Sequence, residues 1–566
     1  MGVKYPPFFL NMSQSTKLKI LFTSEASFIN SGFGNYTREL LTRLHSLNKY
    51  DIAELACYGF VNDPRDSEIK WKYYPNAVRA DDPRYQEYMS RTDNQFGRWR
   101  FDKVIIDFKP HVNCDIRDYW MSYYQGFSAV RPFFNWVLMP TVDSAPQQEQ
   151  WIETFIGADA IFTYSDWAAD VLKKQSDNQI NYIDTVSPGV DLNTFIPKNK
   201  KELRNKYNIP NDAIIIGSVM RNQKRKLIPE LLSSVRQLID RLYEEESPLA
   251  NKIYLYLHTS YPDAGWDIPE LLKETRMSNR TLFTYKCNKC DNVSTCFYTG
   301  PNKICNKCFG FSSRFISVSA GVSNEALSDI YNLFDLYVQY SICEGFGLPQ
   351  IEAGACGIPV ATVNYSAMVD IINKLEAYPI EIGSYFKELE TKAIRVYPSN
   401  TSLVDIIHNH IHLPEIEKLN KSKRIRYLTE LHYSWDKIAD KWENFFDSSP
   451  WLFTSKKSWN DAPNLMRSYD KKIDNPKYVI NEMINICGNH MNNIDLIKSL
   501  PFLDMCRDTS YGFTQSGTSF DAFGDSELIR NLNTMINNHN QIEYVRANNI
   551  SFDDDFIQYA KLKASL

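Results

Sequence analysis

Short apolar runs alternate with longer amphipathic stretches in the first part of the chain. The run Lys17–Thr23 has the composition of a buried strand, and tyrosine and leucine then recur at helical spacing from Tyr36 to Leu44. Further strand-like runs lie at 104–107, 134–139 and 160–163. Because each run is separated from the next by enough residues for a helix, the pattern predicts a βαβ unit with a parallel sheet.

The same alternation restarts after a turn-rich junction at 188–197 and the apolar run Ala213–Val219. The later expected elements are strands at 252–257, 336–339 and 358–362 and helices at 323–334 and 349–356. Two doubly wound units place the C-terminal ends of two parallel sheets across a cleft, where open α/β folds bind ligands. The expected fold class is therefore α/β with two Rossmann-like domains facing a cleft.

Composition excludes some classes of function. The 566 residues are 43% hydrophobic and 23% charged, which is ordinary for globular proteins and predicts two or three packed units. The formal charge of −5 argues against a histone-like or nonspecific DNA-coating role. No run approaches the roughly 18 apolar residues of a membrane span, and the first ten residues are too short and proline-broken for a signal peptide. We therefore expect a cytoplasmic protein.

Four of the eleven cysteines form two Cys-x-x-Cys pairs, Cys287 with Cys290 and Cys305 with Cys308. In a reducing compartment this spacing predicts a metal site rather than disulfides. Four thiolates on two turns make the closed tetrahedral site that is typical of structural Zn²⁺. A ribbon this small could contact nucleic acid or protein, although stabilising a protruding loop is its simplest role.

The most informative stretch runs from Ser341 to Val360 and reads SICEGFGLPQIEAGACGIPV. A glycine-rich turn followed by Pro349 at a first helical position presents free backbone N–H groups and the positive end of a helix dipole, which suits a phosphate. Glu344 precedes the turn and Glu352 lies in the first helical turn, so a carboxylate there can accept hydrogen bonds from a ribose or sugar diol. A lone Glu352 would equally suit a surface residue that complements the helix dipole.

Glu344 and Glu352, with the intervening Gly-Phe-Gly-Leu-Pro and the downstream Ala-Cys-Gly-Ile-Pro-Val, resemble the E-x7-E signature of retaining GT-B glycosyltransferases. The group is the one that includes sucrose and mannosyl transferases, family GT4. Four further segments resemble, in the right order, its N-terminal glycine loop, interdomain junction, donor-phosphate segment and closing helix: 31–40, 187–197, 217–226 and 433–442. The resemblance covers about 17–446.

This resemblance implies a donor site on named residues. Arg221 and Lys226 match the pair that binds the donor diphosphate, and five residues apart after a strand both can face the cleft. A basic cluster in this position is otherwise typical of a solvated surface. Glu344 would hold the sugar and stabilise positive charge at its anomeric carbon, although a nucleophilic role stays open. The other implied substrate-binding residues are Gly32, Gly34, Gly345, Phe346, Gly347, Leu348 and Glu352. The Arg and Lys remove the need for a catalytic metal.

One position departs from the commonest pattern of the family. Many relatives carry a histidine near the donor sugar, whereas the comparable stretch 135–146 has Asp143 in that place. This substitution resembles a subset of the family and implies a catalytic role for Asp143. A loop-capping aspartate is the alternative, and it stays open.

With the resemblance in place, six regions are expected. They are an N-terminal arm (1–16), an acceptor domain (17–195), a nucleotide-sugar donor domain (196–432) with a zinc-ribbon insert (281–312), a crossover helix that packs back on the first domain (433–450) and a helical C-terminal extension (451–566).

The expected function is transfer of a sugar from a nucleotide-diphosphate sugar to an acceptor hydroxyl. The acceptor stays open among glycan, protein, lipid and a modified DNA base, as do the donor base and sugar. Within the enzyme class the alternative is a phosphorylase-like or epimerase use of the same architecture. From another class, the alternative is a sugar- or nucleic-acid-binding protein that has lost catalysis. Intact Glu344, Glu352, Arg221 and Lys226 argue against that loss.

Overall fold

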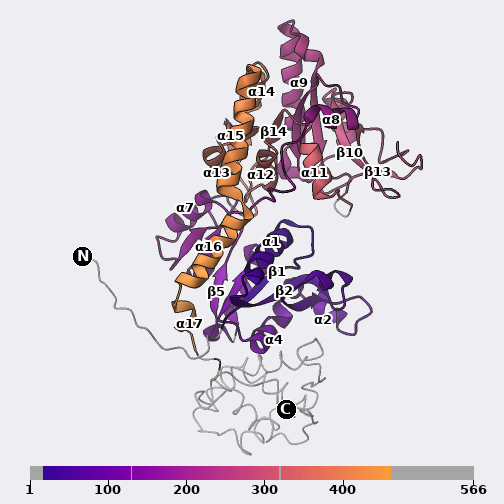
Figure 1. Cartoon of the computed structure of the whole chain (residues 1–566). Helices are drawn as coiled ribbons and strands as arrows, with labels where there is room; N and C mark the ends of the chain where they lie inside the picture. The colour runs from indigo at the N-terminus through magenta and orange to yellow at the C-terminus, as the bar shows by residue number, and fades with distance from the viewer. Residues whose placement is uncertain (1–16, 129, 318–319, 455, 458, 460–566) are drawn as a thin grey trace, which may run out of the picture. The chain divides into compact units, whose positions relative to one another are not determined.

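The computed structural model describes residues 17–454, 456–457 and 459, apart from 129, 318 and 319 (Figure 1). The expected arm 1–16 lies outside the described residues, and so does almost all of the expected extension 451–566. The chain divides into two compact units, 1–138 with 445–566 and 139–444. The boundary expected at 195/196 stays a prediction.

The first unit contains a parallel sheet whose strands pair in the order β3-β2-β1-β4-β5. Its strands are β1 (Leu18–Glu25), β2 (Tyr50–Phe60), β3 (Lys72–Ala77), β4 (Val112–Asp115) and β5 (Asn135–Leu138). Its helices are α1 (Gly32–Ser46), α2 (Tyr85–Met89), α3 (Thr92–Gln95), α4 (Arg98–Phe108), α5 (Tyr119–Ser122) and α17 (Trp451–Thr454), with 3₁₀ helices η1 (Pro64–Glu68), η2 (Tyr123–Phe127) and η3 (Arg131–Phe133).

The second unit begins with α6 (Glu149–Ile156), β6 (Ala160–Thr163), α7 (Asp166–Gln175) and β7 (Ile183–Thr185), in which β6 and β7 pair in parallel. A larger sheet follows in the order β12-β13-β10-β9-β8-β14-β15-β16, and β11 pairs with β10. Its strands are β8 (Ile214–Val219), β9 (Ile253–His258), β10 (Thr281–Cys287), β11 (Val293–Phe297), β12 (Asn302–Lys303), β13 (Ser313–Phe315), β14 (Leu336–Gln339), β15 (Val360–Val363) and β16 (Tyr378–Ile380).

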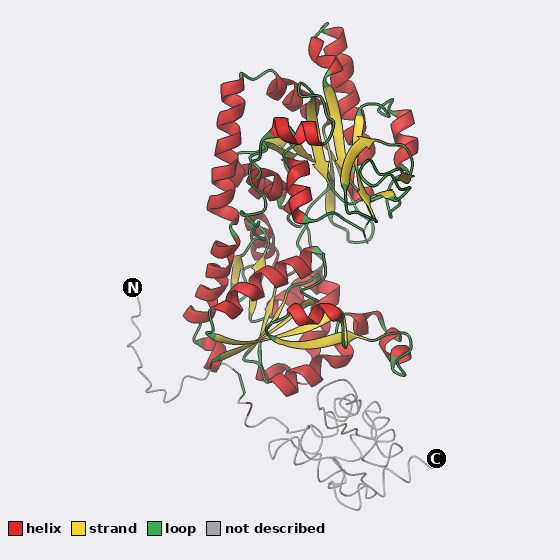
Figure 2. Ribbon diagram, turned by 45° about the vertical axis from the view of Figure 1, so that its right-hand side comes forward, coloured by secondary structure: helices red, strands yellow, loops and turns green. Residues whose placement is uncertain are grey.

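Helices accompany the strands of this second sheet (Figure 2). They are α8 (Lys200–Lys206), α9 (Ile228–Glu244), α10 (Ile268–Glu274), α11 (Asn324–Tyr331), α12 (Leu348–Ala355), α13 (Met368–Leu375), α14 (Asn400–Ile411) and α15 (Glu415–Tyr433), with η4 (Lys224–Lys226) and η5 (Pro248–Asn251). Helix α16 (Trp435–Ser448) follows α15 and packs on β6 through Trp442. A separate hairpin pairs β17 (Ile382–Lys387) with β18 (Ile394–Pro398). The parallel core of this sheet and the parallel strands of the first unit confirm the predicted α/β class.

Most of the expected elements are confirmed, with small shifts at their ends. The apolar face of α1 is buried from Tyr36 to Leu44, and Ser31 caps the helix by accepting a hydrogen bond from the Gly34 N–H. The prediction of a strand at 104–107 is wrong, because these residues lie inside α4. A short apolar run is ambiguous between a buried strand and a buried helix, and here Lys109 in the left-handed region and Pro110 end a helix.

The cysteine segment grows out of an edge of the second sheet. Thr281–Phe283 pair in parallel with β9, while Tyr285–Cys287 pair with β13 in antiparallel fashion. Strand β10 therefore pairs first with β9 and then with β13, and it also pairs with β11 of the cysteine segment from Leu282 to Lys286. The sequence predicted an interruption from 281 onward, and the structure shows that this interruption begins inside a strand.

The expected crossover at 433–450 is helical, with α16 beginning at Trp435. Trp442 packs on Phe162 in the second unit, with ring centroids 4.4 Å apart. Phe446 packs on Tyr50 in the first unit, at 5.5 Å. The helix therefore contributes apolar side chains to both compact units.

Candidate functional site

The glycine-rich turn lies between the C-terminal end of β14 and the first turn of α12. Gly347 precedes the helix with a φ of +89°, a conformation that favours glycine, and Pro349 occupies an early helical position. A Cβ at Gly345 would lie 2.3 Å from Cγ2 of Thr141, so any larger residue there would have to displace the Thr141 side chain. Phe346 is buried against the Tyr433 ring. Leu348 is the first residue of α12. The contacts of Gly345 with Thr141 and of Phe346 with Tyr433 therefore hold the turn in place.

Glu344 is buried at the start of this turn and is surrounded by donors. Its Oε1 accepts hydrogen bonds from Lys226 and from Nε2 of Gln339, at 2.7 Å for the latter, and its Oε2 accepts one from Nη1 of Arg225 at 3.0 Å. Its own N–H donates to Oγ of Ser366 at 3.0 Å. Burial raises the pKa of Glu344, but the adjacent positive charges of Lys226 and Arg225 outweigh it and bring the pKa down to about 2. Glu344 is therefore ionised at neutral pH.

The two basic residues expected from the sequence lie in different surroundings. Lys226 is buried and contacts Glu344. Arg221 is half-exposed and forms a bidentate pair with Asp263, with Nε to Oδ2 at 2.9 Å and Nη2 to Oδ1 at 3.0 Å. Arg225 was missed, although it stands beside Lys226 in the run Lys-Arg-Lys, which was the available signal. The structure therefore brings Lys226, Glu344 and the unpredicted Arg225 together.

Asp143 lies close to the same turn and is held by several donors. Its Oδ1 accepts hydrogen bonds from Ser144 at 2.9 Å and forms an ion pair with Nη1 of Arg395 at 2.8 Å. Its Oδ2 accepts a hydrogen bond from Sγ of Cys343, at 3.4 Å, and Cys343 directly precedes Glu344. Arg395 also pairs with Glu388. The two expected catalytic carboxylates are thus linked through one cysteine.

Glu352 lies on α12, eight positions after Glu344 in the sequence. Its Oε2 accepts a hydrogen bond from the Tyr331 hydroxyl at 2.6 Å. Burial raises the pKa of Glu352 to about 7, against the opposing effect of the Tyr331 hydrogen bond. Unlike Glu344, Glu352 forms no ion pair with a basic side chain among the residues that the structure describes.

Gly32 and Gly34 lie in the first unit, at the start of α1. Gly34 packs against its own loop, because a Cβ there would lie 2.3 Å from the carbonyl oxygen of Ile29. A Cβ at Gly32 would meet no described atom within 4 Å. The two glycines therefore differ: packing requires one, and the other leaves open space at a helix N-terminus.

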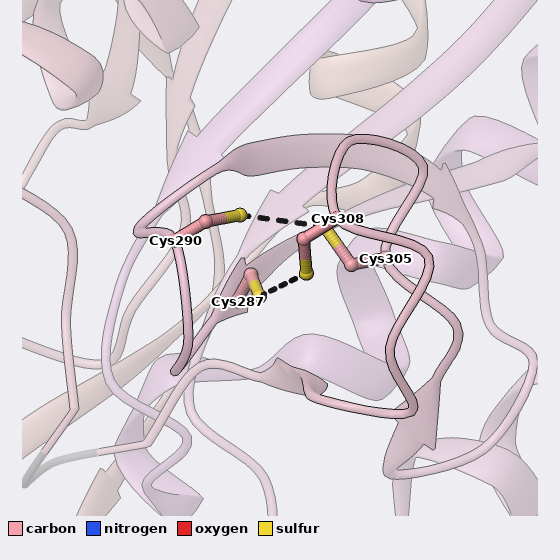
Figure 3. Close-up of side chains that lie close together, drawn as sticks. All are labelled: Cys287, Cys290, Cys305 and Cys308. Carbon is pink, nitrogen blue, oxygen red and sulfur yellow. Dashed lines mark hydrogen bonds between the residues drawn. The ribbon is translucent and has the colours of Figure 1, made fainter.

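The four cysteines of the two pairs form a cluster at the expected place. Their sulfur atoms all lie within 4.8 Å of one another, with Cys287 to Cys308 at 3.6 Å and Cys290 to Cys305 at 3.7 Å (Figure 3). Sulfur atoms bound to one tetrahedral zinc at about 2.3 Å would lie about 3.8 Å apart. The side chains therefore fit a tetrahedral metal ion.

The two cysteine turns have the same backbone geometry. In each turn, the N–H of the lysine donates to the sulfur of the first cysteine at 3.4 Å, from Lys289 to Cys287 and from Lys307 to Cys305. The residue after each second cysteine has a positive φ, 53° at Asp291 and 57° for its counterpart. N–H donors directed at a sulfur stabilise a thiolate, which is the form that binds metal.

The remaining cysteines were expected to be small buried hydrophobes. Cys57, Cys114, Cys343 and Cys356 are buried, whereas Cys296 is half-buried. Cys487 and Cys506 lie outside the described residues.

A cavity of about 470 Å³ lies elsewhere in the second unit. Its lining includes Lys200, Asp335 and His410, close to the N-terminal ends of β8 and β14. Lys200 is paired with Asp335 at 2.8 Å. This cavity lies at the N-terminal ends of the strands, whereas Glu344 follows the C-terminal end of β14. Open α/β sheets bind ligands at the C-terminal ends of their strands, so we do not assign the functional site to this cavity. Among the described helices, none has the length and apolar character required to cross a membrane.

Comparison with known proteins places the turn within a recognised family segment. Residues 316–395 match the family described as glycosyl transferases group 1. The chain is 27% identical to D-inositol 3-phosphate glycosyltransferase 2 of Catenulispora acidiphila over 38% of this chain and 42% of that protein. It is 25% identical to D-inositol 3-phosphate glycosyltransferase of Saccharomonospora viridis over 37% and 41%. The chain thus spans about two-fifths of the length of these relatives.

Solved structures share the fold at low sequence identity. Sucrose-phosphate synthase from Thermosynechococcus elongatus superposes with a TM-score of 0.56 at 16% identity, covering 76% of this chain and 99% of that chain. Anabaena HepE in complex with UDP superposes with a TM-score of 0.52 at 11% identity, covering 76% and 100%. The chain therefore has the two-sheet α/β fold of GT-B glycosyltransferases, and its residues 316–395 match the glycosyl transferases group 1 family.

Proposed function

We propose that the protein is a retaining glycosyltransferase that moves a sugar from a nucleotide-diphosphate sugar to an acceptor hydroxyl. The observation that carries this proposal is the ionised Glu344 in contact with Lys226 and Arg225, at the start of a glycine-rich turn that leads into α12. The names of the relatives, D-inositol 3-phosphate glycosyltransferases, and the UDP complex of Anabaena HepE support a nucleotide-sugar donor.

The positive groups around the turn suit departure of a nucleotide diphosphate. As the glycosidic bond breaks, negative charge grows on the diphosphate, and cations and helix N–H groups placed there stabilise the transition state more than the ground state. Lys226 and the N-terminus of α12 would supply this, with Arg221 as the second predicted cation. Arg225 is a third cation in the same run. In this arrangement the chain's own cations do the work that a catalytic metal does elsewhere.

The contacts of Glu344 favour an electrostatic role over a nucleophilic one. Its pKa of about 2 leaves it ionised, so it is not a general acid. Both of its oxygens accept hydrogen bonds, which lowers the electron density available for attack on the anomeric carbon. We therefore assign Glu344 to holding the donor sugar and stabilising positive charge at that carbon. The acceptor would attack on the face that the leaving group vacates, which retains the configuration.

The other predicted residues have supporting roles in this proposal. Asp143 would accept a hydrogen bond from a donor-sugar or acceptor hydroxyl, and Glu352 would bind the nucleotide ribose. Gly32 and Gly34 would allow close approach of backbone to the donor. Acceptor binding is assigned to 17–195 and donor binding to 196–432.

The cysteine cluster is assigned to one structural Zn²⁺, bound by Cys287, Cys290, Cys305 and Cys308. When bound, the ion would cross-link the two turns and stabilise a segment with little core of its own. The compartment we propose is the cytoplasm, in which such thiols stay reduced.

The test is release of nucleoside diphosphate from a panel of nucleotide sugars by the purified protein. We expect turnover with one member of the panel, and loss of that turnover in Lys226→Met. The matched control is Lys224→Met, because Lys224 lies in the same basic run and is exposed. The anomeric configuration of the transferred sugar, read by NMR, tests retention.

Two outcomes would contradict the proposal. Equal turnover in Lys226→Met and wild type would place the reaction elsewhere. Thermal stabilisation by a nucleotide sugar with no turnover under any condition would favour the alternative of a binding protein that has lost catalysis.

A further inference from the structure

The second cysteine turn exposes large apolar side chains to solvent. Phe309 is 80% exposed, Phe311 is 74% exposed and Ile304 is 62% exposed. The three lie together, because the N–H of Cys305 donates to the carbonyl of Gly310 at 2.9 Å, which brings Ile304 beside the two residues that flank Gly310. We call Ile304, Phe309 and Phe311 the apolar tip. Exposed apolar clusters of this kind mark interaction sites on soluble proteins.

The backbone at Phe309 indicates that folding alone does not explain this residue. Its φ is 57°, in the left-handed region, where bulky residues are uncommon. The equivalent position of the first turn is Asp291, with φ 53°, and aspartate tolerates this conformation. A phenylalanine side chain that is 80% exposed buries little apolar surface within the chain, so it contributes little to folding. Its benefit is therefore expected from a contact outside the chain.

The surroundings of the apolar tip are positively charged. The stretch 286–315 has five basic residues and one acidic residue, whereas the whole chain carries a formal charge of −5. Lys289 and Lys307, one in each cysteine turn, are exposed, and neither has an ion-pair partner among the described residues. Arg314 is exposed as well. The surface thus combines a small apolar projection with unpaired cations.

We propose that the apolar tip and its lysines form a docking surface for an anionic lipid bilayer. Insertion of two phenylalanines and an isoleucine into the interface between headgroups and acyl chains buries apolar surface, while Lys289 and Lys307 meet lipid phosphates. Single-stranded nucleic acid is less well matched, because it binds along a positively charged groove that follows its backbone, whereas the apolar tip projects into solvent and one of its three side chains, Ile304, has no aromatic face. The surface contains none of the side chains that are given a role in sugar transfer, so this inference stands independently of the proposed function.

The experiment is co-sedimentation of the full chain with vesicles of phosphatidylcholine alone and of equal parts phosphatidylcholine and phosphatidylglycerol. We expect binding to the anionic vesicles, weakened by added salt because surface charges are screened. Phe309→Asn is the sharpest variant, since asparagine suits a left-handed backbone and keeps the turn folded. It should lower the bound fraction at limiting lipid by about tenfold. Lys289→Gln with Lys307→Gln should remove the preference for anionic vesicles.

The matched control is Leu389→Ser, at a leucine that is 94% exposed elsewhere in the same unit. Its vesicle binding should equal that of the wild type, and equal zinc content in all variants checks that the turns stay folded. Absence of binding to anionic vesicles at low salt would overturn the proposal. Binding of a labelled single-stranded oligonucleotide that is lost in Phe309→Asn, without vesicle binding, would replace it with a nucleic-acid surface. Nucleoside diphosphate release by Phe309→Asn in vesicle-free solution should equal wild type, which separates this proposal from the sugar-transfer proposal.

Discussion

Glu344 and Glu352 show how surroundings separate two carboxyl groups of one motif. Both were identified from sequence spacing, but only the structure shows that Lys226 and Arg225 hold the first in its charged form while burial favours the neutral form of the second. Sequence spacing fixes neither effect, because the two cations that contact Glu344 come from a segment more than 100 residues away. Arg225 was not predicted for the same reason. Which basic residues of the run 224–226 contact Glu344 depends on the backbone path of η4, and the sequence does not show that path.

At Lys226 we expect the largest loss of turnover. In Lys226→Met the diphosphate loses a charge-assisted contact that strengthens as the glycosidic bond breaks, so kcat should fall by about 10²-fold or more while donor KM changes less. Steady-state kinetics with the donor found in the panel provide the measurement. A variant in which KM rises and kcat stays constant would show that Lys226 contributes only ground-state binding.

Glu352 should make stability depend on pH. Its pKa in the folded protein, about 7, lies above its ordinary value of 4.5, so the folded state binds the proton more tightly. The resulting stability is fully present below about pH 4.5 and is lost as pH rises through 7. Glu352→Gln stays neutral and can still accept the Tyr331 hydrogen bond. Its Tm should match wild type at acidic pH and exceed it at pH 8, by about 2–4 °C if the gain is on the order of 1 kcal/mol. Equal Tm values at pH 8 would contradict the raised pKa.

Asp143 is paired with Arg395, and a substitution at Asp143 tests whether this carboxylate also takes part in sugar transfer. If it helps the acceptor lose its proton, Asp143→Asn should lower the transfer rate by about 10²-fold with donor affinity near normal. If Asp143 only anchors Arg395, the variant should lose thermal stability and keep its turnover, because Glu388 still pairs with that arginine. Transfer rate and Tm measured on the same preparation distinguish the two roles.

Elements differ in how well their patterns predicted them. Strands β6, β8 and β14 were predicted nearly to the residue, because each is a buried apolar run bounded by polar sequence. The run inside α4 was misassigned, since a helix buried on most sides has no polar face to reveal its period. Strand β2 was not predicted, because its eleven residues include polar positions and its burial depends on pairing with both β1 and β3.

The cysteine turns were predicted from spacing alone, because the geometry of such turns is local. We expect elemental analysis to find about one zinc per chain, and Cys305→Ser to lose it together with the order of the segment. Turnover in solution should largely survive, as the cluster shares no residue with the site around Glu344. Cys296→Ser is the matched control, since Cys296 lies between the pairs and is not in the cluster. Wild-type protein without zinc, with four freely titrating thiols in this segment, would contradict the assignment.

At the scale of the whole molecule, the division into two compact units bears on how ligand binding is detected. The residues around Glu344 all belong to the second unit, whose sheet and helices support them. A ligand that binds only the folded form of that unit stabilises it by mass action, by about 2.7 kcal/mol when its concentration is 100 times Kd.

As a test of the proposed nucleotide-sugar donor, with UDP chosen because it is bound in Anabaena HepE, we expect UDP to raise the melting temperature of the unit that carries Glu344. In calorimetry this transition should move upward with UDP concentration, whereas a transition of the other unit, where resolved, should stay in place. Lys226→Met should reduce the shift, because it removes a cation from the phosphate site, and Lys224→Met should preserve it. If UDP shifts both variants equally, the nucleotide binds away from Lys226. If UDP gives no shift while another nucleoside diphosphate does, the phosphate site stands and the donor base is the one in that nucleotide.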